Sequence, residues 1–230
     1  MSLVKYGGGV VQMSGSIAGT TFARNASGNY ARARTKPINP SSALQVSRRT
    51  LMAYLTEYWH ETCTATQRTA WATYANAVVM KNRLGESIKI SGFNHFCRSN
   101  AVHMTMGLAI TPEGPSTLTL PEIDPLFAIA GSVATQLLSI TYDATLPWHS
   151  VVGSGLAIFM GRPQVATRNF FKGPWNYAGK IVIADTSPKT IPAPFTLVLG
   201  QKIWCYARIS EGALGSRCSN KYSDDAIVAA

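Results

Sequence analysis

The chain has 230 residues, 46% of them hydrophobic, which is enough for a sizeable core and excludes disorder throughout. No apolar run approaches the roughly 18 residues of a membrane span and no secretory signal is recognisable, so we expect no membrane partner. Charged residues make up only 14%, yet the formal net charge is +10. A surface so poor in charge favours cover by other subunits, although surfaces rich in Ser and Thr also stay soluble.

The excess of positive charge lies in the first half of the chain. Residues 1–108 contain twelve Lys or Arg and three acids, whereas residues 109–230 contain nine and eight. The first 56 residues contain seven basic side chains and no acid. A basic segment of this kind is typical of a region that contacts an anionic partner.

Residues 1–40 predict an extended, basic β-hairpin arm. A glycine-rich stretch precedes a turn at residues 25–28, and the side chains of residues 30–34 alternate with the period of a strand. A flat, glycine-rich hairpin keeps an exposed edge and buries little apolar surface. We therefore expect the arm to be ordered by another molecule that covers it.

The basic arm is also the first candidate interaction site. If Arg24 pairs with Asn29, the large side chains of the strand after the turn share one face of the hairpin with much smaller side chains of the strand before it. This face would then contain a flat strip that another surface can approach. The candidate contact residues of the arm are Arg24, Tyr30, Arg32, Arg34 and Lys36.

Residues 41–111 predict a small three-helix unit. Ser41 or Ser42 is placed to cap the first helix, residues 64–67 match a capping box that begins the second, and Ser91 precedes the third. Apolar and aromatic side chains recur on one side of each helix. A helical core is therefore a better explanation of these aromatic residues than a surface that stacks nucleic-acid bases.

Residues 112–125, rich in Pro, predict a linker, and the pattern then changes to short apolar runs separated by turns. About seven short strands over residues 126–230 predict a β-sandwich, and the whole chain is expected to be α+β. The strand candidates are 137–142, 155–160, 180–184, 195–199, 202–209 and 225–229.

The end of the chain resembles a fibronectin type III domain. In residues 199–209 a glycine turn leads into a strand with aromatic side chains, and residues 212–216 supply a glycine- and serine-containing hairpin loop before the last strand. The early tryptophan of that family has no clear counterpart here, so a related immunoglobulin-like sandwich stays open. The resemblance implies a binding or spacer module.

Residues 14–100 resemble uncharacterised virion-associated proteins of tailed bacteriophages and prophages. The resemblance implies a structural component of the virion, at the head or the head–tail junction, made in the host cytoplasm. It supplies no catalytic residue. The shared positions are 15–20, Gly28, 32–34, Pro37, Asn39, Pro40, Gln45, Arg49, Gln67, Arg68, Trp71, 91–96 and Asn100.

Nothing in the sequence favours an enzyme. Ser154 lacks the spacing of a nucleophile elbow, and the eleven acids include only one adjacent pair. The histidines and cysteines lack the spacing of metal ligands, so we expect no metal and no cofactor. Cys205 and Cys218 are expected to be buried thiols rather than a disulfide.

A second candidate interaction site lies in a stretch rich in Gly and Pro between two strands. Its aromatic side chains either form an exposed contact patch or fold back to cap one end of the sandwich. The residues of this second group are Phe170, Phe171, Trp175 and Tyr177.

These features favour a structural virion protein with a decoration, cement or connector role, anchored by its basic arm to neighbouring capsid, neck or tail subunits. We expect it to be a homo-oligomer in the assembled particle. The alternative is a nucleic-acid-binding protein whose arm contacts phosphates without reading bases. A third reading, an adhesion or carbohydrate-binding module, depends only on the sandwich and the second aromatic group.

Overall fold

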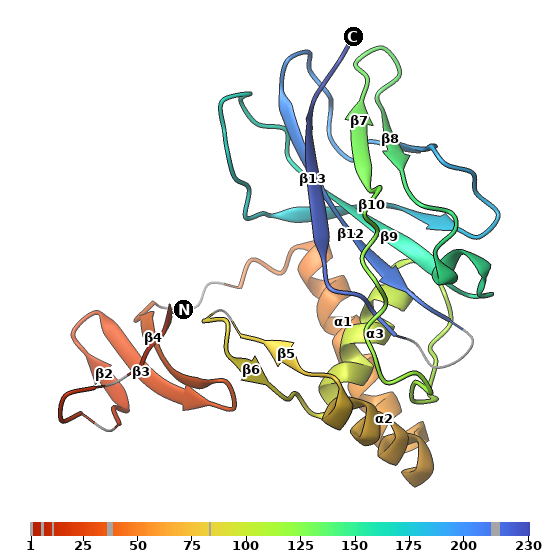
Figure 1. Cartoon of the computed structure of the whole chain (residues 1–230). Coiled ribbons are helices and arrows are strands. Elements are labelled where there is room, and N and C mark those ends of the chain that lie inside the picture. Colours follow the sequence, from red (N-terminus) through yellow and green to blue (C-terminus); the bar gives the residue numbers. More distant parts are fainter. Residues whose placement is uncertain (1, 6, 11, 36–38, 83, 213–216) are drawn as a thin grey trace.

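The computed structural model describes residues 2–5, 7–10, 12–35, 39–82, 84–212 and 217–230 (Figure 1). In these ranges a small N-terminal sheet comes first, three α-helices follow, and two further sheets complete the chain. The predicted α+β class is confirmed. None of the described helices combines the length and the apolarity that a bilayer span requires.

The N-terminal sheet contains the predicted hairpin and two additional strands. Its strand order is β1-β4-β3-β2, and every pairing is antiparallel. Arg24 lies opposite Asn29, so the predicted register is confirmed. The turn is stabilised by the Asn25 side chain, which accepts a hydrogen bond from the Ser27 amide at 2.9 Å. The bounds are β1 (Ser2–Leu3), β2 (Gly15–Ile17), β3 (Thr20–Asn25) and β4 (Gly28–Ala33).

The three helices begin at the predicted caps. The Ser42 and Ser91 side chains accept amide hydrogen bonds at the first and third helix, and Thr64 forms a reciprocal capping box with Gln67 at the second. Two short strands between the second and the third helix pair antiparallel, with Met80 opposite Ile88. The elements are α1 (Ala43–Glu57), continued by a π-turn η1 (Tyr58–Thr62), α2 (Ala65–Ala77), β5 (Met80–Lys81), β6 (Ser87–Ile88) and α3 (Gly92–Thr105).

The predicted linker contains no helix or strand, but it packs closely on the helical unit. The Trp71 indole donates a hydrogen bond to the Pro112 carbonyl at 2.9 Å. The Asn100 side chain bonds both the amide and the carbonyl of Thr111. A Cβ atom at Gly114 would lie 2.7 Å from the Ala70 backbone, so the chain passes against α2 at a distance that only glycine permits.

The remaining seven strands form two antiparallel sheets, with strand orders β11-β8-β7 and β10-β9-β12-β13. Side chains from both sheets, such as Leu138, Ile158 and Ile203, belong to one buried core. The bounds are β7 (Ala128–Gly131), β8 (Leu137–Thr141), β9 (Gly155–Gly161), β10 (Trp175–Val182), β11 (Lys189–Pro192), β12 (Lys202–Ser210) and β13 (Tyr222–Ile227), with a short 3-10 helix η2 (Pro147–Ser150).

The strand predicted at residues 195–199 was wrong. The amide and carbonyl of Leu197 bond the Gln136 side chain, at 2.8 and 3.0 Å, instead of a neighbouring strand. The apolar run is explained by the Leu197 side chain, which is 1% exposed in the core between the sheets. The strand that precedes this run is β11, which ends at Pro192.

The outer face of the sheet β10-β9-β12-β13 rests on α3 (Figure 1). Val102 of α3 and Met106, which follows the helix as its C-cap, belong to one buried apolar cluster with Phe159 of β9. The Arg98 guanidinium donates to the carbonyl groups of Cys218 and Ser219, which precede the last strand. The helical unit and the two-sheet body are thus joined by both apolar packing and charge-assisted hydrogen bonds.

Candidate functional site

The N-terminal sheet has almost no core of its own. In the described part of residues 3–35 every residue is half-buried or exposed, and none belongs to a buried apolar cluster. Among the described residues of this sheet the aromatic side chains are those of Phe22 and Tyr30, and both are only half-buried. A small sheet held mainly by backbone pairing is marginally stable in water, because little apolar burial offsets the entropy of ordering.

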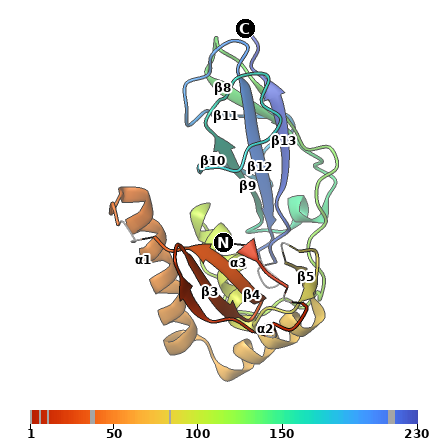
Figure 2. The same ribbon diagram turned by 90° about the vertical axis from the view of Figure 1, so that its left-hand side faces the viewer.

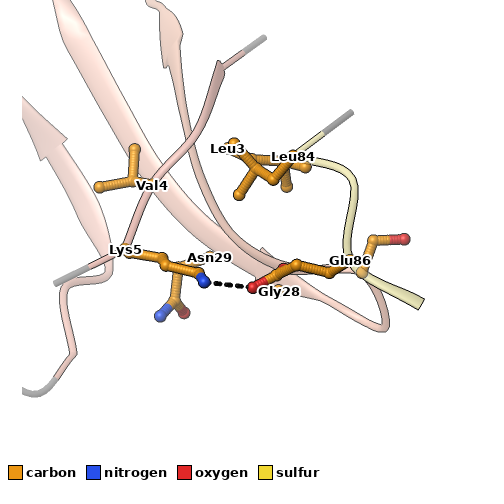
Figure 3. A pocket seen from close by; sticks show the side chains of 8 residues that line it. Leu3, Val4, Lys5, Gly28, Asn29, Leu84 and Glu86 are labelled. Carbon is orange, nitrogen blue, oxygen red and sulfur yellow. Dashed lines mark ion pairs between the residues drawn. The ribbon is translucent and has the colours of Figure 1, made fainter. Parts of the chain in front are cut away.

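The sheet stands to one side of the helices, next to the β5–β6 hairpin (Figures 1 and 2). The Lys5 ammonium forms an ion pair with the Glu86 carboxylate at 2.5 Å, shown as a dashed line in Figure 3. This bond and a second one from Asn82 lower the pKa of Glu86. Leu3 and Leu84 line a cavity of about 280 Å³ beside the pair. An exposed ion pair of this kind contributes little to stability.

The arginines of the predicted arm site are exposed on both faces of the sheet. Arg32 lies opposite Thr21, and Tyr30 lies opposite Ala23, so these cationic and aromatic side chains share one face with small neighbours. Arg24 belongs to the other face, with Asn29. The structure therefore brings part of the predicted site together and divides the rest between two faces.

Arg34 follows the end of β4, where its amide bonds the Gly19 carbonyl at 2.8 Å. Within the described residues, the guanidinium groups of Arg24, Arg32 and Arg34 have neither an ion pair nor a hydrogen bond. Lys36, the remaining member of the predicted site, lies outside the described residues. The arm thus presents positive charge that the described part of the chain leaves without a counterion.

The second predicted site is folded back onto its own sheet. The Phe171 ring is nearly parallel to Trp204, with centroids 5.7 Å apart, and edge-on to Trp175 at 4.8 Å. Gly161 of β9 lies beneath it, and a Cβ atom there would come within 2.1 Å of the ring. Phe170 remains 61% exposed. The cations of Arg168 and Lys172 lie 5.5 and 5.7 Å from its ring centre.

The other two residues of this group belong to β10, which begins inside the predicted loop. Trp175 packs edge-on to Tyr206 at 4.9 Å, and Tyr177 packs against Phe159 at 5.6 Å. Tyr206 and Phe159 stack at 4.6 Å and complete a continuous row of rings on the outer face of the sheet. The group therefore covers this face, and Phe170 is its exposed member.

Trp175 and Tyr177 also wall a groove against α1 that sequence reasoning missed. Two adjoining cavities, of about 580 and 630 Å³, share Leu44, Arg48 and Tyr177. Arg48 donates a hydrogen bond to the Thr105 hydroxyl at 2.6 Å. The sequence did contain a sign of this groove. Helix α1 has more apolar residues than one face of a helix can hold, which indicates that a second face also contacts another part of the protein.

Two histidines of α3 are buried where the helical unit meets its neighbours. Within the described residues neither ring nitrogen of His95 has a hydrogen-bond partner, and burial beside Tyr74 and Arg98 lowers its pKa to about 4. Nδ1 of His103 lies 3.1 Å from the Ser210 hydroxyl, and burial lowers its pKa as well. In the described ranges no three His, Cys, Asp or Glu side chains gather to hold a metal ion.

All four cysteines are buried free thiols. Burial raises the pKa of the Cys97 thiol to about 11 and that of Cys205 to about 12. A protonated, buried thiol is a poor nucleophile, so Cys97 and Cys205 act in packing, each within a buried apolar cluster. Comparison of the chain with protein-family models and with curated proteins finds no match to either.

Proposed function

We propose that this chain is a structural protein of a tailed-bacteriophage particle, anchored through its N-terminal sheet to neighbouring capsid, neck or tail subunits. The observation that carries the proposal is a four-stranded sheet with unpaired arginines on both faces and no buried residue in its described part. A sheet of this kind gains stability when other surfaces cover it. It suits a decoration, cement or connector role better than catalysis.

Docking can use two features of the sheet. The edge strand β2 is exposed along its whole length, and its open backbone groups can pair with a strand of a neighbour. Arg32 on one face and Arg24 on the other can each meet carboxylates, so the sheet suits a position between two acidic surfaces. The exposed Lys5–Glu86 ion pair contributes little stability, so its loss on docking would cost little.

The C-terminal part fits a spacer or bridging module with a fibronectin type III-like sandwich. Seven strands divide three and four between two sheets that share one core. In constant-type immunoglobulin domains the fourth strand lies with the first, second and fifth. Here β10, the fourth strand of this region, lies beside β9, the third, which supports the fibronectin type III-like arrangement.

The test is incorporation into particles. The triple variant Arg24→Glu, Arg32→Glu and Arg34→Glu should lose incorporation, measured by mass spectrometry of purified particles. Deletion of residues 2–35 should have the same effect and leave the two-sheet body folded. A matched control makes the same change of charge at exposed lysines elsewhere, Lys81, Lys89 and Lys221. Incorporation that survives both arm variants contradicts the proposal.

Unpaired guanidinium groups also fit a sheet that binds nucleic-acid phosphates, which is the second candidate function. Titration with duplex DNA at two salt concentrations separates the two. Binding that weakens steeply with salt and disappears in the triple arginine variant favours nucleic acid. Salt-insensitive or absent binding removes this candidate.

A further inference from the structure

Helix α1 exposes apolar side chains on more than one side. Leu55 anchors it in the helical core, yet Leu44, Val46, Met52 and Tyr54 are 65%, 48%, 43% and 44% exposed. A surface helix whose contacts are complete places one apolar stripe against the core and polar residues in water. The additional apolar surface on α1 therefore indicates a further contact.

The side of α1 opposite Leu55 carries a mixed stripe of two apolar and two charged side chains. Helical periodicity places Val46, Arg49, Ala53 and Glu57 along it, and all four are exposed. Arg49 uses one N–H to bond the Asn39 side chain at 2.8 Å, which leaves its other donors available. The Ala53 side chain in the middle is small enough to let another helix approach closely.

The charges of α1 oppose its own macrodipole. Its first turn contains no acid and its last turn no base; Arg48 and Arg49 lie in its first half, whereas Glu57 and Glu61 lie at its end. The N-terminal end of a helix is positive and the C-terminal end negative, so these side chains add to the dipole instead of offsetting it. A helix packed antiparallel would bring the opposite charge to each end.

We propose that a second copy of this chain covers the stripe, with the two α1 helices antiparallel about a two-fold axis at Ala53. This arrangement sets Arg49 of each copy opposite the partner's Glu57. Each contact occurs twice, as in an isologous interface. Figure 2 shows α1 at the margin of the molecule, where a partner helix can reach it.

The charge pattern favours this occupant over others. A parallel helix pair would set Arg49 against its own copy, and a phosphate backbone would meet the carboxylate of Glu57. The antiparallel pair satisfies both charges with residues that the chain itself supplies. Like charges placed opposite each other destabilise a pair, whereas opposite charges select partner and orientation.

Charge exchange tests the arrangement. Sedimentation of the full chain at about 100 µM should show a dimer, since a complex of micromolar dissociation constant is formed at that concentration. Arg49→Glu and Glu57→Arg should each weaken association by about tenfold or more, because each creates two repulsive pairs. An equimolar mixture of the two variants should recover the dimer, since every pair is then complementary. Lys89→Glu, an exposed site without a described partner, is the matched control.

A cross-link tests the axis itself. Ala53→Cys should form a disulfide-linked dimer under mild oxidation, whereas the exposed α2 control Ala77→Cys should not; the native cysteines are buried. Circular dichroism checks that each variant is folded, and recovery in the mixture shows that Arg49→Glu has not merely damaged the fold. The proposal is overturned by a monomeric chain, by a dimer that tolerates Arg49→Glu, or by Ala53→Cys that fails to cross-link.

Discussion

Replacement of Gly161 by alanine tests how the aromatic row on the outer sheet face is held in place. Gly161 is the last residue of β9 and has no positive φ, so alanine causes no backbone strain. Its new methyl group would lie 2.1 Å from Cε1 of Phe171. The ring must then leave its position beside Trp204 and Trp175. Two aromatic contacts of about 0.5–1.5 kcal/mol each are lost, so we expect a destabilisation of about 2 kcal/mol.

Urea denaturation followed by tryptophan fluorescence measures this change, since two tryptophans border the ring. A double-mutant cycle with Phe171→Ala identifies the cause. If the clash with the ring is responsible, Gly161→Ala should cost less than about 0.5 kcal/mol when Phe171 is already absent. An equal cost in both backgrounds would refute the reasoning and assign the role of Gly161 to the strand itself.

Two further predictions concern polar side chains, the buried His95 and the half-buried Gln136. The pKa of His95 falls from 6.5 to about 4 on folding, so the unfolded chain binds the proton first as the pH drops. Stability should therefore be complete above about pH 7 and fall by up to about 3 kcal/mol towards pH 4. Urea midpoints across this range should show a smaller fall in His95→Phe, and an unchanged slope contradicts the assignment. Gln136→Ala should cost about 2 kcal/mol in the same assay because it leaves the amide and carbonyl of Leu197 without partners; a cost below about 0.5 kcal/mol contradicts this role.

The parts of the fold that could be predicted depend on neighbours along the chain. Helix caps at Ser42, Thr64 and Ser91 satisfy amides only three residues away, so a short sequence pattern is sufficient. The hairpin register of the arm follows from a turn of a few residues. The basic charge of the arm is a property of composition, and no folding step changes it.

The candidate sites required more than the local pattern. The sequence placed the arginines of the arm on a hairpin, but the pairing of Ser2 and Leu3 with β4 joins segments almost thirty residues apart. The groove of Trp175 and Tyr177 depends on α1, more than a hundred residues earlier. No pattern within one segment reveals which other segment will lie against it.

By itself, the sequence determined the α+β class, the helix starts, the hairpin register and the concentration of positive charge, because these depend on short spacings and on residue counts. Only the tertiary structure decided that residues 195–199 are not a strand, since a distant glutamine side chain occupies their backbone groups. It also decided that Phe171 folds back, since its ring packs on Trp204 and over Gly161, which has no side chain to block it. These outcomes depend on contacts between remote segments, whose free energies exceed the local preferences of the residues involved.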